Sequence, residues 1–239
     1  MTATLILAVG VALTPLQAYN QGNALYAQKD YAGAVEAYRH ALEAGPSAAV
    51  HYNLGNALFK SGQIGRAILN YRRARTLDPR DPDIAANLDF ARSYRVDKVL
   101  AVPSPFARVL DAAFHRLSRR EAAVLAPVGF LLAGLLLSLW IVRRGAALAV
   151  GAALAALLAL FGLVTQQVWA AEVAARPAVV VMPEVNALSG PSEEFKQILL
   201  AHDGTEVGIR EARGDYLLVQ LPGGTGGWVR KDAVERVYP

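Results

Sequence analysis

The sequence predicts a multidomain protein in which an all-α repeat domain, a two-helix transmembrane hairpin and a small all-β barrel follow one another along the chain. Three observations predict this order: a segment that recurs 33 residues later, two uncharged apolar runs that only three residues separate, and a C-terminal region of short runs between turn residues. Hydrophobic residues make up 54% of the 239 residues and charged residues only 18%. A soluble surface needs more charge than this, so the apolar excess must lie in particular segments.

The chain opens with an apolar segment at residues 4–16, which is too short to cross a membrane as a helix. Ala18 lies just beyond it and suits cleavage by a signal peptidase, although no Lys or Arg precedes the apolar segment. We therefore expect residues 1–18 to form a signal peptide, with a retained anchor or a buried helix as the alternatives.

Residues 19–26 and 52–59 have matching sequences, and the match continues through the pairs Ala34/Ala67, Tyr38/Tyr71, Ala41/Ala74 and Pro46/Pro79. A period near 34 with this pattern resembles the tetratricopeptide repeat, and the resemblance implies two helix–turn–helix units. A third unit begins at residue 81 and keeps only its first helix, to about residue 94. Because two repeats alone bury little apolar surface, we expect this helix to cap a repeat domain over residues 19–100.

In such repeats the first helix of each unit lines a concave groove. Polar residues of these three helices are the candidate partner-binding site: Asn20, Asn23, Asn53, Asn56, Lys60 and Asn87. Their amides and the lysine would hold a peptide backbone or a C-terminal carboxylate. The alternative is a solvated groove, because these asparagines also belong to the generic repeat pattern.

Four arginines gather on the second helix of the second repeat: Arg66, Arg72, Arg73 and Arg75. A solvated outer face is the favoured interpretation, and contact with anionic lipid headgroups or with an acidic partner is the alternative. Residues 19–120 carry 15 Lys and Arg against 9 Asp and Glu, whereas residues 171–239 carry 7 against 10. No interleaved aromatic pattern accompanies the basic residues, so nucleic acid is not an expected partner.

Residues 101–120 form the junction with the membrane. Two prolines break the chain, and the apolar residues that follow, from Phe106 to Leu117, fall on one face of a helix. We expect an amphipathic juxtamembrane helix that either lies in the membrane interface or packs on the repeat domain. Ser118 and Glu121 then predict a capping box at the start of the first span.

The two apolar runs, residues 122–142 and 146–168, contain no charged residue, and each is long enough as a helix to cross about 30 Å of hydrocarbon. The short connection between them forces an antiparallel hairpin, which we place at residues 121–170. Small residues in the second run allow the helices to approach closely: Gly151, Ala152, Ala155, Ala156 and Ala159. A buried hairpin of a soluble protein is the alternative.

Such a hairpin places both flanking domains on one side of the membrane. Arg143 and Arg144 favour a cytoplasmic turn, but three arginines flank the first span at its other end, so the charges do not agree. We give more weight to the signal-like N-terminus. It places the chain in a bacterial inner membrane with both domains extracytoplasmic.

Short β-type runs begin after Ala175, at residues 178–182, 185–188, 196–200, 205–210, 216–221 and 227–229, with glycine-rich turns between them. The segments 186–192, 203–205 and 227–229 resemble the bacterial SH3-like domain, which we place at residues 176–239. The resemblance implies binding of cell-wall peptides or proteins without catalysis. Tyr216 and Trp228 are the candidate ligand residues, although both are also expected as core side chains.

We expect no enzyme and no cofactor. The four histidines, His40, His51, His115 and His202, have no metal-ligand spacing to one another or to a carboxylate, so no metal site is predicted. The chain has no cysteine, and no phosphate-binding glycine loop or nucleophile elbow occurs in it.

The order of signal segment, repeats, hairpin and SH3-like domain resembles the BatE-type proteins of the aerotolerance operon. The segments 87–93 and 96–98 fit that family as well. The resemblance implies association with membrane proteins that carry von Willebrand A domains and with a MoxR-type ATPase. We therefore expect a membrane-anchored scaffold that binds protein partners and contacts membrane lipid. A peptidoglycan-binding sensor of the cell wall is the alternative.

Overall fold

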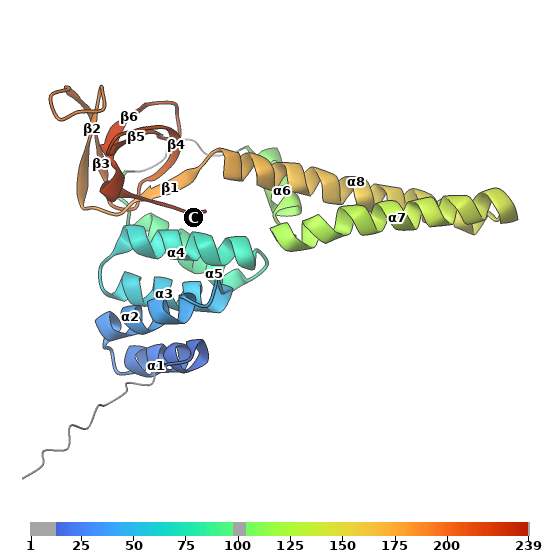
Figure 1. Cartoon of the computed structure of the whole chain (residues 1–239), viewed down its shortest axis with the longest axis horizontal. Helices are drawn as coiled ribbons and strands as arrows, with labels where there is room; N and C mark the ends of the chain where they lie inside the picture. The colour runs from blue at the N-terminus through green and yellow to red at the C-terminus, as the bar shows by residue number, and fades with distance from the viewer. Residues whose placement is uncertain (1–12, 98–103, 239) are drawn as a thin grey trace, which may run out of the picture.

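A computed structural model describes residues 13–97 and 104–238 of the chain. It contains a stack of short helices, a long helical hairpin that projects from one side of the molecule, and a β-sheet domain that lies on the stack (Figure 1). The three-part fold predicted from the sequence is confirmed. The apolar segment at residues 4–16 lies mostly outside the described residues.

Five helices form the stack: α1 (Pro15–Ala27), α2 (Tyr31–Leu42), α3 (Ala48–Lys60), α4 (Ile64–Leu77) and α5 (Pro82–Ser93). The helix α1 begins inside the predicted signal peptide. Thr14 caps it by a reciprocal capping box with Gln17, and Ala18 is fully buried. The single helix α5 follows the two pairs, as the truncated third unit predicts.

Both repeats pack through the same contact of a glycine with a tyrosine ring. A Cβ atom on Gly22 would lie 2.5 Å from a ring carbon of Tyr38, and a Cβ atom on Gly55 would lie 2.7 Å from the matching carbon of Tyr71. Any larger side chain would push the two helices of the unit apart. The recurrence of this pair therefore fixes the spacing of the helices within each repeat.

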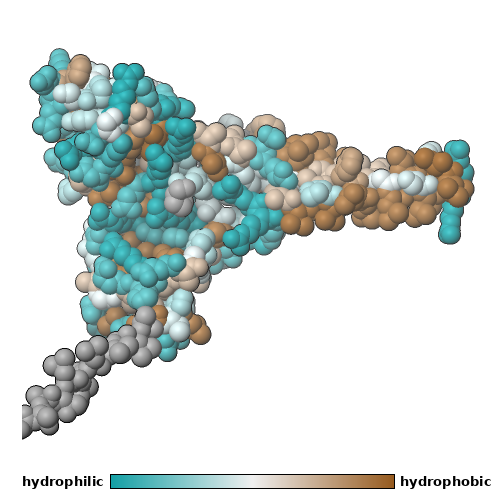
Figure 2. All heavy atoms as spheres, in the orientation of Figure 1, coloured by the Kyte–Doolittle hydropathy of each residue, from teal (hydrophilic) through white to brown (hydrophobic). Residues whose placement is uncertain are grey.

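The projecting hairpin consists of α7 (Arg119–Arg143) and α8 (Ala146–Ala174). Ser118 and Glu121 form the predicted capping box, and Arg144 turns the chain between the helices with a φ of 49°. Both helices are long and apolar enough to cross a membrane, and only 11% and 17% of their most apolar 18-residue windows are buried. Their apolar surface faces outward along the hairpin, between a polar tip and the polar globular part (Figure 2).

Two glycines set the distance between the helices of the hairpin. A Cβ atom on Gly129 would lie 2.8 Å from the backbone nitrogen of Ala159, and one on Gly162 would lie 2.8 Å from that of Ala126. Small residues therefore allow the close approach of the helices, as predicted. The contacts at Gly129 and Gly162 are closer than the contact at Gly151.

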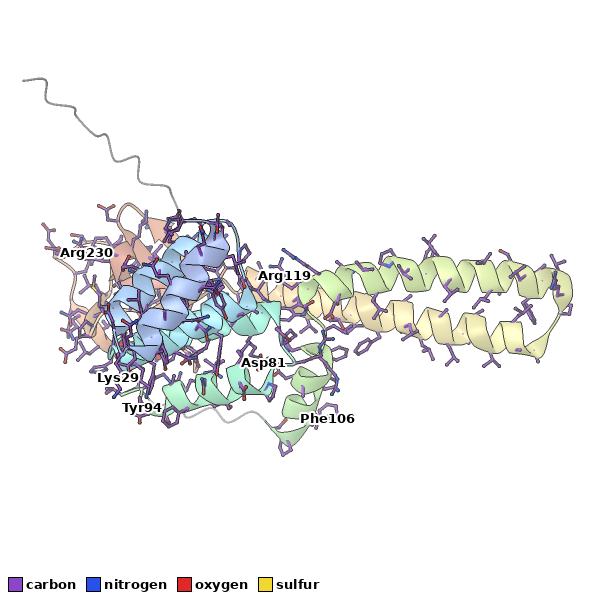
Figure 3. The ribbon with its side chains drawn as sticks, turned by 90° about the horizontal axis from the view of Figure 1, so that it is seen from below. Lys29, Asp81, Tyr94, Phe106, Arg119 and Arg230 are labelled. Carbon is purple, nitrogen blue, oxygen red and sulfur yellow. The ribbon has the colours of Figure 1, made fainter. Side chains whose placement is uncertain are left out.

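The helix α6 (Pro105–Phe114) lies beside the base of the hairpin. Phe114 stacks on Phe161 of α8 with 5.6 Å between the ring centroids, and Asp111 makes an ion pair of 3.5 Å with Arg75 of α4. Phe106 and Val109 are exposed, at 72% and 65%, and Phe106 points away from the rest of the chain (Figure 3). The helix thus touches both the hairpin and the repeat stack, while its apolar residues Phe106 and Val109 remain exposed.

The C-terminal domain is an antiparallel sheet of seven strands in the order β3-β2-β6-β5-β4-β1-β7. The strands are β1 (Pro177–Val180), β2 (Glu184–Leu188), β3 (Gln197–His202), β4 (Glu206–Arg213), β5 (Tyr216–Gln220), β6 (Gly226–Arg230) and β7 (Val234–Arg236). All six predicted strands are present. Strand β7 was not predicted, because two of its three residues are charged.

The sheet domain completes the core of the repeat stack. Every residue of β1 is buried. Ala178 and Val180 belong to the core of the sheet, whereas Val179 and Val237 belong to the core of the helical stack. One strand therefore serves two cores, and the sheet covers α4, which would otherwise expose an apolar face at the end of the repeats (Figure 1).

Candidate partner-binding site

The candidate groove residues lie on α1, α3 and α5, the first helices of the three units. We call this surface the asparagine face, defined by Asn20, Asn23, Asn53, Asn56, Lys60 and Asn87. Four of the asparagines form two hydrogen-bonded pairs that join successive units. Asn53 donates to Asn23 (3.2 Å), and Asn87 donates to Asn56 (2.9 Å).

Tyrosines complete both pairs in the same way. Tyr38 donates to Asn23 Oδ1 and Tyr71 donates to Asn56 Oδ1, each at 2.8 Å. The Nδ2 atom of Asn53 also donates to the hydroxyl of Tyr19 (3.0 Å), and that of Asn87 donates to Tyr52 (3.0 Å). Burial of the Tyr38 hydroxyl raises its pKa to about 12, so it remains a hydrogen-bond donor at neutral pH.

We call this set of hydrogen bonds between asparagine and tyrosine side chains the asparagine ladder. It uses either the oxygen or the nitrogen of each amide group and leaves the other atom open. Asn23 and Asn56 accept twice through Oδ1 and keep their NH₂ groups, whereas Asn53 and Asn87 donate twice through Nδ2 and keep their oxygens. Within the described part of the chain no hydrogen bond reaches these remaining atoms. The face therefore offers donors and acceptors in alternation along the stack.

Asn20 and Lys60 stand outside the ladder. Both are exposed, and neither makes a hydrogen bond or an ion pair with the residues that the structure describes. They remain available to a ligand without any change in the packing of the helices.

An aromatic cluster that was not predicted from the sequence includes the residue next to Lys60. Phe59, Phe90 and Tyr94 pack with their ring centroids 5.2–5.5 Å apart. Phe90 is 54% exposed and Tyr94 is 57% exposed. The signal in the sequence was that Tyr94 follows Phe90 by four residues, which brings two side chains together on one face of a helix.

The basic cluster of α4 binds the sheet domain, so the expectation of a solvated outer face is wrong. Arg72 donates to Glu206 (3.0 Å), Arg66 donates to Glu235 (3.0 Å), and Arg73 donates to the carbonyl of Arg236 (2.6 Å). The acidic partner of the alternative interpretation therefore lies in the same chain. Arg75 binds the juxtamembrane helix instead.

Glu206 is the centre of this contact. Arg92 donates to it twice, at 2.8 and 2.9 Å, and Arg95 donates once, at 3.0 Å. Its side chain is only 14% exposed. Burial acts to raise the pKa of the Glu206 carboxyl, but the hydrogen bonds and charges of Arg92, Arg72 and Arg95 hold it below its ordinary value.

A second carboxylate, Asp97, joins the end of the repeat domain to the sheet. It accepts hydrogen bonds from the backbone nitrogen of His202 (2.8 Å), from His202 Nδ1 (2.9 Å) and from the hydroxyl of Thr205 (2.5 Å). These contacts follow α5 directly, so the repeat domain is attached to the sheet at both α4 and α5.

The two candidate residues of the sheet domain have different surroundings. Trp228 is 7% exposed, pairs with Leu188 and Leu218 across the sheet, and lies under the guanidinium of Arg213. It is buried, but on the opposite face from the main core, to which Val229 belongs.

Tyr216 is half-buried and lines a pocket of about 330 Å³. The other polar residues of this pocket are Glu184, Asn186, Glu193 and Arg230. The structure thus leaves Tyr216, but not Trp228, open to a ligand.

The described residues contain no cluster of three or more His, Asp or Glu side chains that could hold a metal ion. His51 is buried and bound to Asn70 (3.0 Å), and burial lowers its pKa. His115 contacts Glu172 (3.1 Å), and His202 contacts Asp97. These three histidines therefore have structural partners.

Residues 19–82 match the tetratricopeptide repeat family. This match covers the first two helix pairs and the start of α5, which are the elements that build most of the asparagine face. No match to a curated protein was found for the chain. Tetratricopeptide repeats are protein-interaction modules, so the comparison indicates binding of protein partners.

Proposed function

We propose that this chain is a membrane-anchored, non-enzymatic scaffold whose asparagine face binds an extended segment of a protein partner. The observation that carries the proposal is the row of open amide atoms, in which NH₂ groups of Asn23 and Asn56 alternate with oxygens of Asn53 and Asn87. An extended backbone offers one donor and one acceptor per residue, so such a row complements it. Because the ladder fixes the asparagine side chains, binding them costs little rotamer entropy.

The chemistry beside the row suggests which kind of segment binds. Phe90 and Tyr94 offer exposed apolar surface, and the exposed Lys60 directly follows Phe59 of the same aromatic cluster. A peptide segment with a large apolar side chain followed by a carboxylate would contact the aromatic rings and pair with the lysine.

The test must avoid the ladder, because Asn23→Ala or Asn56→Ala would also remove contacts that hold the repeats together. The double variant Lys60→Glu with Phe90→Ala changes the face without breaking any of its hydrogen bonds. The matched control is Arg39→Ala on α2, whose only ion pair among the described residues is with its neighbour Glu36. Loss of a co-purifying protein in the double variant but not in the control supports the proposal, whereas equal recovery refutes it.

The hairpin is the proposed anchor. Both ends of the α7–α8 pair adjoin the globular part (Figure 1), so both globular domains would lie on the same side of the membrane. The chain has no cysteine, so single substitutions of the exposed residues Ala44 and Glu194 by cysteine give a clean test with an impermeant maleimide in intact cells. Labelling of both supports an extracytoplasmic position, and labelling of neither until lysis refutes it.

The finer assignment is that of the BatE-type proteins, with an SH3-like sheet domain and with partners that carry von Willebrand A domains or belong to the MoxR-type ATPases. It rests on the order of the segments along the sequence. A co-purification that recovers neither class of partner would reject this assignment while leaving the scaffold proposal intact.

The alternative function is binding of peptidoglycan by the sheet domain. The pocket at Tyr216 favours it, because two carboxylates and Arg230 line this pocket and suit the amines and carboxylates of wall peptides. Retention of the detergent-solubilised full chain on purified sacculi, and its loss on Tyr216→Ala, would support wall binding. Absence of retention would remove it.

A further inference from the structure

A cleft of about 1030 Å³ lies between the repeat stack, the start of α7 and the end of the sheet domain. Its basic residues are Arg73, Arg119 and Arg120, and its one acidic residue is Asp78. Leu77 and Ala123 are among its apolar residues. None of the candidate functions above uses this cleft.

The cleft lies at the level where the hairpin becomes apolar. Gln166 of α8 donates to the carbonyl of Ala122 (2.9 Å), and Trp169 donates to the carbonyl of Leu117 (2.9 Å). These two polar side chains mark the ends of the apolar segments on both helices, and tryptophan is typical of the boundary between hydrocarbon and headgroups. Arg119 lies at this base of the hairpin (Figure 3).

None of the three arginines makes an ion pair with a carboxylate among the described residues, and Arg73 donates to the backbone carbonyls of Arg236 and Val237. Arg119 lies over the ring of Tyr238, with 5.6 Å between its guanidinium carbon and the ring centroid. Arg120 makes no hydrogen bond or ion pair within the described residues. The neighbouring acid, Glu121, is bound to Arg80 (2.6 Å) and to Ser118. The cleft therefore has a surplus of positive charge and unused guanidinium donors, which suits a phosphate group.

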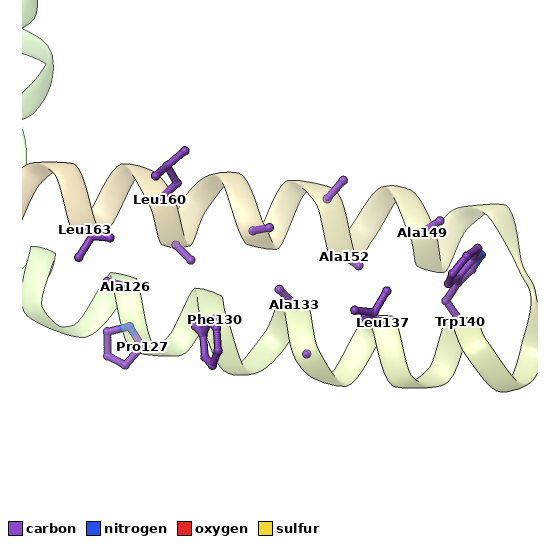
Figure 4. A pocket seen from close by; sticks show the side chains of 14 residues that line it. Ala126, Pro127, Phe130, Ala133, Leu137, Trp140, Ala149, Ala152, Leu160 and Leu163 are labelled. Atoms are coloured by element: carbon purple, nitrogen blue, oxygen red, sulfur yellow. The ribbon is translucent and has the colours of Figure 1, made fainter.

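An apolar groove along the hairpin begins one helical turn beyond the cleft. Ala123 lines the cleft, and Ala126 and Pro127, which lie three and four residues further on the same face of α7, line the groove. The groove has a volume of about 980 Å³ and extends to Trp140 at the far end of the helix (Figure 4). From Ala126 to Trp140 the helix rises roughly 21 Å, at about 1.5 Å per residue.

We infer that this cleft and groove bind one anionic phospholipid, with its phosphate among Arg73, Arg119 and Arg120 and one acyl chain along the hairpin. The inference rests on the proposed membrane anchor. Neutral lipids also fill apolar grooves, but they do not compensate the positive charge of the cleft. An anionic headgroup is therefore the occupant that fits both parts.

The test uses the full chain, purified from the membrane fraction, delipidated in detergent and offered phosphatidylglycerol or phosphatidylcholine of the same chain length. Native mass spectrometry counts the bound lipids. We expect one phosphatidylglycerol to be retained with at least a tenfold preference over phosphatidylcholine. In Arg119→Gln with Arg120→Gln the preference should fall about tenfold or more, because the variant loses charge-assisted hydrogen bonds to the phosphate group.

The matched control is Arg116→Gln with Arg143→Gln, which removes the same charge from two exposed positions outside the cleft. This variant should keep the preference. A second variant, Ala123→Phe, narrows the cleft without changing charge and should also reduce retention. Circular dichroism of each variant checks that the helices remain folded.

Other outcomes would overturn the inference. Equal binding of the two lipids, or equal loss in the variant and its control, would mean that the lipid is bound only by general attraction. Complete displacement by millimolar inorganic phosphate would mean a free phosphate site. Occupation of the groove by a partner's helix would appear as a purified complex that retains no lipid. Recovery of the wild-type chain in the soluble fraction would refute the anchor as well, whereas the preceding outcomes refute the lipid site alone.

Discussion

Neutralising Glu206 should release the sheet domain from the repeat stack. Four nitrogen–oxygen contacts of 2.8–3.0 Å connect this carboxylate to Arg72, Arg92 and Arg95. The side chains involved are only 13–27% exposed, so water replaces few of the lost contacts. Glu206→Gln keeps the size of the side chain but removes the carboxylate that the three arginines share, although Arg72 keeps its ion pair with Glu172 and Arg92 keeps its ion pair with Asp89.

The expected loss of docking free energy is about 2–4 kcal/mol. Removing one partner of a buried ion pair costs about 3–5 kcal/mol, and we expect about 1 kcal/mol less here because glutamine still accepts one of the hydrogen bonds. Ile68 of α4 reports the opening, because it is fully buried beside Gly204 of the sheet domain. In an Ile68→Cys background, the equilibrium constant for thiol exposure should rise roughly 30- to 700-fold, since 1.4 kcal/mol is tenfold.

The matched control is Glu211→Gln in the same strand. Glu211 is 43% exposed and, within the part of the chain that the structure describes, pairs only with the neighbouring Arg213, so the loss of its charge should cost less than about 1 kcal/mol. If the two variants expose the thiol equally, the arginine cluster does not hold the domains together and the reasoning fails.

The same contact predicts a pH dependence. Because the pKa of the docked Glu206 lies below the ordinary value of 4.5, its contribution is fully present above pH 4.5. The contribution is lost as the pH falls through the lower pKa of the docked state. Thiol exposure in the parent protein should therefore increase below pH 4.5, and Glu206→Gln should flatten that increase.

Three further predictions follow from other contacts. Asp97→Asn weakens the contact with His202, and we expect a loss of about 1–2 kcal/mol in the same thiol assay. Gly162→Leu forces a side chain to within 2.8 Å of the backbone of the facing helix and should destabilise the hairpin by about 1–3 kcal/mol in thermal melts, whereas Gly134→Leu, with open space around it, should not. Tyr71→Phe removes a buried donor of the asparagine ladder and should cost about 1 kcal/mol in denaturant unfolding of the repeats.

Periodic patterns in the sequence were sufficient to predict the three-part fold. The repeat offset of 33 placed the helix pairs, and the two apolar runs placed the hairpin. The contact between the domains leaves no such pattern, because Arg72 and Glu206 are 134 residues apart. The opposite net charges of residues 19–120 and 171–239 were visible, but charge alone does not distinguish a solvated face from a docked one.

The sequence predicted which helices carry the candidate asparagines, but not which of their amide atoms are already hydrogen-bonded. The repeat pattern places Asn23, Asn53, Asn56 and Asn87 on one face. It does not reveal that each amide is half occupied, because the tyrosines that bind them come from the opposite helix of the unit and from the preceding unit. Which atoms remain for a ligand follows only from the geometry.

The connections between the parts determine how the scaffold would present its binding face. Only Ala175 and Arg176 separate α8 from β1, so the sheet domain cannot move far from the end of the hairpin. The sheet is in turn fixed to α4 and α5 through Glu206 and Asp97. The asparagine face therefore keeps a constant height above the end of the hairpin. In a membrane this arrangement favours partners whose binding segment lies at the same height above the bilayer as the asparagine face. A rigid connection raises the effective concentration of the binding face for its partner only where the length of the connection matches the distance between them.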